Sequence, residues 1–177
     1  MPKSTKLGYE VKTDWKGLDD LWKRLQDLNQ KEIEYGFINE DKYPVGDKRG
    51  GMYVADIAWK QEQGFETTGQ PAPPRPFFTQ SIADAKSYVR GVAPMIFKLS
   101  FIGKVEKEML NIGRNLVQTV KTSIDDAQFP LNTERTLDLK APETRVLHET
   151  GLMYDSINAR IVNRDAYGQR KKEVDIK

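Results

Sequence analysis

The amino-acid sequence predicts an α+β fold, in which an antiparallel β-sheet is flanked by one long helix and two or three shorter helices, with extended loops and terminal arms. Two observations carry this prediction. Apolar residues recur at three- and four-residue steps in several stretches, whereas around residues 33–37 and 157–161 they alternate with polar ones. The first spacing gives a helix one apolar face, and the second does the same for a strand.

The N-terminal part predicts a strand, a helix and a second strand. Apolar residues first alternate over a short stretch, at Leu7, Tyr9 and Val11. From Thr13 or Asp14 they follow the helical spacing, at Leu18, Leu21, Trp22, Leu25 and Leu28. A half-buried strand is expected next, because Ile33, Tyr35 and Phe37 alternate with Glu32 and Glu34.

Turn-forming residues then divide the chain. Residues 40–51 are polar and contain three glycines, which predicts a long exposed loop with a mobile hairpin tip. A short helix is expected over residues 52–63 and should end at Gly64. The segment 65–76 contains four prolines, which remove backbone donors and hold their neighbours extended. This segment therefore predicts a stiff connector.

Two further helices follow the connector. One is expected from Phe77 to about Val92, where Gly91 and Pro94 interrupt the pattern. The next carries its apolar stripe on one side only and is expected to be the longest helix, with the stripe at Val105, Met109, Ile112, Leu116, Val120 and Ile124.

The C-terminal part begins with a second long loop, expected over residues 128–147. Thr150 and Gly151 are expected to cap a short helix through the threonine hydroxyl. A strand over residues 157–161 and a charged tail over 164–177 complete the chain. Residues 1–163 are thus expected to form one domain.

Composition narrows the possible functions. The 28 lysines and arginines nearly balance the 26 acidic residues, so a net charge of +2 does not favour a protein that coats DNA. The chain has no cysteine, which excludes disulfides, thiolate metal sites and a cysteine nucleophile. It contains no long apolar stretch and begins with a polar segment, so neither secretion nor membrane anchoring is expected.

Motifs for catalysis are weak. His148 and Glu149 resemble the start of a zinc-protease motif, but position 152 is leucine and His148 is the only histidine. Ser156, His148 and Asp155 lack the glycine-flanked serine that a hydrolase triad on this pattern requires. The glycines of residues 46–51 lack the spacing of a phosphate-binding loop. We therefore predict no catalytic, metal or cofactor site and no enzyme activity.

Four segments stand in a distinctive order along the chain: YVADIAWKQEQG at residues 53–64, PPRPFF at 73–78, FPLN at 129–132 and LHETGLMYDSI at 147–157. Together with the long amphipathic helix between them, they resemble the neck and tail-completion proteins of long-tailed bacteriophages over about residues 30–162. The chain departs from the family pattern at Ala72, where isoleucine is usual, at Glu149, where aspartate is commoner, and in the placement of Gly64 before Phe65.

The resemblance implies a structural subunit of the virion, made in the bacterial host cytoplasm. It would form a closed homo-oligomeric ring of about six copies that joins the head to the tail. Its partners would be further copies of itself and neighbouring head-closure, tail terminator, tail tube or sheath proteins. Genomic DNA would pass through without sequence recognition, and no cofactor, metal or membrane is implied.

The proline-rich segment has two interpretations. Pro73, Pro74, Arg75, Phe77 and Phe78 could form an assembly interface, since a pre-ordered segment loses little entropy on docking. Alternatively, the segment is a strap within the chain that starts the next helix at Pro76.

Other functions stay open on the sequence alone. A tail terminator that caps the tail tube would share the same architecture. A small hydrolase or nuclease would need converging carboxylates, for example Asp19 or Asp20 with Glu32 and Glu149. A DNA-binding accessory factor or chaperone would be a monomer or dimer, and its DNA binding would depend on salt.

Overall fold

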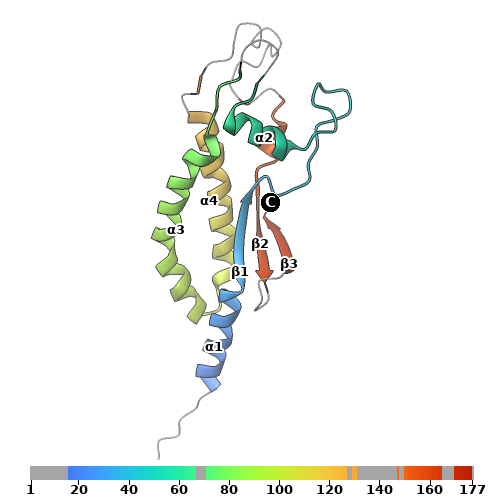
Figure 1. Cartoon of the computed structure of the whole chain (residues 1–177). Coiled ribbons are helices and arrows are strands. Elements are labelled where there is room, and N and C mark those ends of the chain that lie inside the picture. The colour runs from blue at the N-terminus through green and yellow to red at the C-terminus, as the bar shows by residue number, and fades with distance from the viewer. Residues whose placement is uncertain are drawn as a thin grey trace, which may run out of the picture.

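Two long helices and a three-stranded sheet form the body of the protein (Figure 1). The computed structural model describes residues 16–66, 71–126, 129–130, 147 and 150–164, and the backbone of 170–176. The elements follow in the order α1 (Lys16–Asn29), β1 (Lys31–Gly36), α2 (Val54–Gln63), α3 (Phe77–Phe101), α4 (Val105–Asp126), α6 (Leu152–Asp155), β2 (Asn158–Arg164) and β3 (Arg170–Ile176). This mixture of helices and antiparallel sheet confirms the α+β class.

The sheet is antiparallel, in the order β1-β2-β3. On one face, Ile33 lies opposite Ile161 and Tyr35 opposite Ala159, and this face packs against Met109 of α4. On the other face, Arg160 donates to Glu34 at 3.0 Å. Alternation of apolar and charged residues in β1 therefore separates a core face from a charged face, as the spacing predicted.

α4 supplies the other half of the core. Its predicted stripe is buried from Met109 to Ile124. The buried residues belong to three clusters, which include residues of the sheet, of α3 and of α6. They are Met109, Ile112, Leu116, Val120 and Ile124. α4 contacts both β1 and β2, whereas α3 packs mainly along α4. Figure 1 shows the result, with α4 beside the sheet and α3 on the far side of α4.

The extent of α3 corrects the sequence prediction. The helix does not end near Val92 but continues through Gly91 and Pro94 to Phe101, so at 25 residues it exceeds the 22 of α4. The body therefore has two long helices where one was expected. Pro94 removes the backbone donor that would bond the carbonyl of Arg90, but Arg90 is exposed, so water can satisfy that carbonyl.

The C-terminal segment also differs from the prediction. Residues 164–177 were expected to be a charged tail, whereas Arg170–Ile176 forms β3 and pairs with β2, with Ala159 opposite Ile176. A strand with so many charged residues lacks the apolar alternation that identifies a strand in a sequence. The free backbone edge of β2 supplies the pairing instead.

Two expected elements lie outside the described residues. They are the strand at residues 7–11 and most of the loop at 128–147, of which the structure describes Phe129, Pro130 and Leu147. Within the described part of the chain, no helix combines the length and apolar character needed to cross a membrane.

Replacing Ile161 tests this account of the core. Ile161 lies on the central strand and is 1% exposed, so Ile161→Ala should lower the free energy of unfolding by about 2–5 kcal/mol. Val45→Ala is the control, because Val45 is 98% exposed and its truncation should change stability by less than about 0.5 kcal/mol. Urea unfolding measures both, and equal costs would contradict the assignment of the core.

Candidate assembly interface

The proline-rich segment is bonded to the end of α2. The Arg75 backbone N–H donates to the Gln61 carbonyl oxygen at 2.9 Å, and Arg75 Nη1 donates to Gln61 Oε1 at 2.8 Å. The Arg75 side chain is buried, and this burial lowers the pKa of its guanidinium. Arg75 therefore acts within the chain and links two segments that are fourteen residues apart.

Glu62 connects the same end of α2 to the start of α3. Its carboxylate, with the residue 7% exposed, accepts hydrogen bonds from the backbone N–H groups of Phe78 and Thr79, both at 2.9 Å. The first N–H groups of a helix have no partner within the helix, and α3 begins after Pro76, which offers no capping side chain. Glu62 therefore caps α3 from another element, with its negative charge at the positive end of the helix dipole.

Both phenylalanines of the segment pack within the chain. Phe77 is 1% exposed and meets Phe37 edge to face, with ring centroids 6.3 Å apart. Phe78 is half-buried and stacks on Tyr35 at 5.8 Å. Of the five residues predicted as an interface, only Pro73 and Pro74 are exposed. The structure thus shows the strap, with Pro76 at the N-cap position of α3.

Thr150 and Gly151 directly precede α6, and the N-cap position is that of Gly151, not of Thr150. Thr150 Oγ1 accepts a hydrogen bond from the Leu152 N–H at 3.3 Å, and Gly151 has the left-handed backbone with φ 73°. The helix brings Met153 and Ile157 into the core beside α4. Thr150 and Gly151 therefore have a structural role at the start of α6.

The loop at residues 40–51 is closed by its own hydrogen bonds. Tyr43 is buried; its N–H donates to the Met52 carbonyl and its carbonyl accepts from the Gly51 N–H, both at 3.0 Å. The Arg49 guanidinium lies 4.1 Å from the centre of the Tyr43 ring and pairs with Asp47. This pairing with Arg49 lowers the pKa of the Asp47 carboxyl. Val45, at the tip of the loop, is 98% exposed.

Several large apolar side chains are exposed where α1 meets the C-terminal part of α3. Arg24 Nη1 donates to the Phe101 carbonyl at 2.7 Å, which holds the two helices together. Five apolar side chains on this part of the molecule are between 43% and 63% exposed, namely Leu18, Trp22, Phe97, Phe101 and Ile102. We call these five residues the apolar end surface. The predicted apolar stripe of α1 is thus only partly covered, and no residue of α1 is buried.

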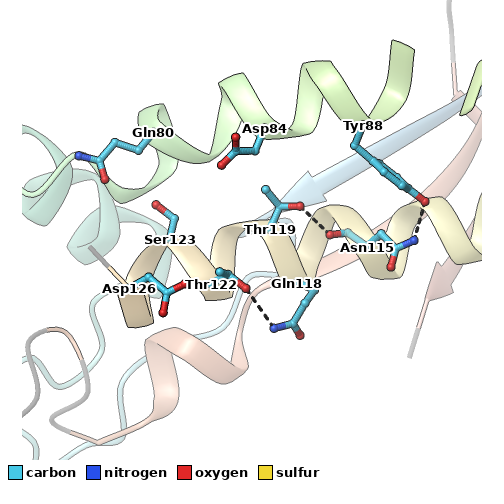
Figure 2. A pocket seen from close by; sticks show the side chains of 9 residues that line it. All are labelled: Gln80, Asp84, Tyr88, Asn115, Gln118, Thr119, Thr122, Ser123 and Asp126. Carbon is cyan, nitrogen blue, oxygen red and sulfur yellow. Dashed lines mark hydrogen bonds between the residues drawn. The ribbon is translucent and has the colours of Figure 1, made fainter. Parts of the chain in front are cut away.

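A polar groove of about 640 Å³ is lined by residues of α3 and α4 (Figure 2). Its side chains bond mainly to one another and to the backbone. Asn115 Nδ2 donates to the Tyr88 hydroxyl, Thr119 Oγ1 donates to the Asn115 carbonyl at 2.9 Å, and Ser123 Oγ donates to the Phe77 carbonyl at 2.7 Å. These groups can hydrogen-bond a polar partner. Among the residues that line the groove, the only charged ones are Asp84 and Asp126.

The residues considered for catalysis do not converge in the described part of the chain. Asp19 and Asp20 are exposed on α1, while Glu32 pairs with Arg164 on the charged face of the sheet. His148 and Glu149 lie outside the described residues. Among the residues that are described, no three histidine, aspartate or glutamate side chains are placed to hold a metal ion.

Glu62→Ala tests the cap on α3. The substitution leaves the N–H groups of Phe78 and Thr79 without their acceptor, so the free energy of unfolding should fall by about 2–3 kcal/mol. Glu66→Ala is the control, because Glu66 is an exposed glutamate only four residues further on. Chemical denaturation compares the two, and a Glu62 variant as stable as the Glu66 variant would show that the cap is unimportant.

Gly64→Ala tests how closely the strap lies against the end of α2. Gly64 has φ 75°, and a Cβ there would lie 2.7 Å from the Ala72 carbonyl oxygen, so we expect a loss of about 1–3 kcal/mol. Gly91→Ala should do the opposite and stabilise by about 0.5–1 kcal/mol, because Gly91 is helical and nothing lies near its added Cβ. Thermal unfolding shows whether each substitution raises or lowers stability. Two changes in stability of the same sign would contradict this geometry.

No protein-family model, curated protein or solved structure matches the chain.

Proposed function

We propose that the chain is a structural ring subunit of the neck or tail-completion region of a long-tailed bacteriophage. In this role it joins the head-closure complex to the tail and leaves a passage for the genome. Support comes from the order of the four sequence segments and from one structural observation, the exposure of the apolar end surface on an isolated chain.

The apolar end surface requires a partner. From Val92 to Ile102 the chain contains a single charged residue, Lys98, and a helix that is apolar on all sides is normally buried. Large contiguous apolar patches on soluble proteins mark sites of association. Trp22 and Phe97 belong to the residue types that are enriched at the centres of interfaces.

The position of α1 suits a ring. Figure 1 shows α1 extending beyond the end of the sheet, so that it can reach an adjacent subunit. In a cyclic assembly one surface of each copy meets a different surface of the next, and a projecting arm provides such an unequal contact. Tail terminators share this requirement, so the position of the ring within the virion is a separate question.

The charge of the chain agrees with a passage through which DNA slides. A net charge of +2 over 177 residues gives no strong attraction for phosphates, and a tightly binding channel would hold the genome back. The proposed partners are therefore copies of the chain and adjacent head or tail proteins, with DNA as a passing cargo.

Electron microscopy tests the proposal. The chain should be purified together with the products of neighbouring genes and viewed in negative stain. A ring seated at the end of a tail or below a head is the expected result. A chain that joins neither heads nor tails, and that instead shows salt-sensitive binding to DNA as a monomer or dimer, would contradict it.

Phe97→Glu should disrupt the ring without unfolding the subunit. Phe97 is 54% exposed, so the monomer tolerates a charge there, whereas a charge buried between subunits has no partner. Gln118→Glu adds the same charge to an exposed position on the polar groove and should leave assembly unchanged. Light scattering after size-exclusion chromatography measures the mass of each variant, and a Phe97→Glu ring of wild-type mass would remove the apolar end surface from the interface.

A further inference from the structure

An apolar groove of about 800 Å³ lies between β1, α3 and α4. Here α3 packs mainly along α4 and reaches β1 through contacts such as that of Phe78 with Tyr35. Its floor includes Ile112 and Leu116, which are buried, and its walls include Ile33 of β1 and Ile82 and Val89 of α3. Along α3 the lining extends from Phe78 to Ile96, a distance of about 27 Å at the helical rise.

One wall of the groove is an unpaired strand edge. β1 is the first strand of the sheet, and within the described residues no strand pairs with its other side. The Arg164 N–H donates to the Gln30 carbonyl at 2.8 Å, which shows that the even-numbered residues exchange hydrogen bonds with β2. The N–H and C=O groups of Lys31, Ile33 and Tyr35 therefore point toward the open edge, and the side chains of the same residues line the groove.

These features define the occupant as one more strand. It needs three apolar side chains at alternate positions, facing α3 and α4, while its backbone bonds to the three outward residues of β1. The segment Leu7-Gly8-Tyr9-Glu10-Val11, which precedes α1 in the sequence, has this pattern. Five residues of strand measure about 17 Å, which fits within the length of the groove.

Chain length favours a neighbouring copy as the source of the strand. Val11 is five residues from Lys16, and that stretch spans at most about 18 Å when fully extended. α1 has 14 residues, so it separates Lys16 from the start of the sheet by about 20 Å. Figure 1 shows α1 pointing away from the sheet, so within one chain residues 11–16 would have to run back fully extended along nearly the whole of α1 to reach the groove. A second copy has no such restriction.

We propose that residues 7–11 of a neighbouring copy add a fourth strand to the free edge of β1 and fill this groove. The inference rests on the proposed ring and specifies how adjacent subunits join. Each copy gives its N-terminal segment to one neighbour and receives a segment from the other, which is the unequal contact that closes a ring. The added strand turns the two helices and three strands into two complete layers.

Cross-linking between single-cysteine chains tests the inference, because the protein has no cysteine of its own. One chain carries Tyr9→Cys and the other Val89→Cys, at the rim of the groove; they are mixed and treated with a short bismaleimide. A covalent dimer is expected. Replacing the second chain with one that carries Gln118→Cys, on the opposite side of the helix pair, should give none.

A second experiment measures how much the strand at residues 7–11 contributes to ring formation. Tyr9→Asp places a charge against the apolar groove and should weaken ring formation roughly tenfold or more, with an unchanged circular dichroism spectrum. Glu10→Gln, on the alternate face of the same segment, should have little effect. Sedimentation velocity over a range of concentrations measures both.

The outcomes separate this inference from the proposed function. A wild-type ring that tolerates Tyr9→Asp and gives no mixed cross-link overturns the strand exchange but leaves the ring intact. Cross-linking that occurs only inside a chain carrying both cysteines overturns the exchange between copies. A wild-type chain that stays monomeric contradicts the ring, and the absence of mixed cross-links would then overturn the groove assignment as well.

Discussion

The buried carboxylate of Glu62 determines how the two halves of the chain are joined. Its two hydrogen bonds to the first N–H groups of α3 fix the end of one helix against the start of another, across a connector that is bonded to α2 through Arg75. Because α3 continues into the turn before α4, this junction also sets the position of the helix pair over the sheet. The strap thus has a defined structural role that does not require a partner.

The junction has a consequence for the surface. α3 is held beside α4, so its apolar residues exceed what α4 can cover, and the edge of β1 faces an apolar groove. The same helix ends at Phe101, beyond the body of the sheet, where α1 covers it only in part. Both uncovered regions are apolar, and both lie where a neighbouring subunit can add a strand or a helix. This excess of apolar surface connects the fold to the proposed ring.

Much of the fold could be predicted from spacing alone. The stripe of α4 and the alternation of Ile33 and Tyr35 both describe elements with one apolar and one polar face. The end of α3 and the strand β3 could not be predicted in this way, since a proline suggests a break and a highly charged strand pairs through its backbone. The role of Glu62 was missed because it depends on contacts sixteen residues apart. One signal was available, namely that a helix starting with Pro-Phe-Phe has no capping side chain of its own.

In the proposed ring, the exposed apolar surfaces of this chain are covered by further copies of itself. Native mass spectrometry of the purified wild-type chain tests this proposal most directly, because it reports the number of subunits in each species. We expect one closed assembly of about six subunits with few open intermediates. A spectrum that contains only monomer across the accessible concentrations would contradict it.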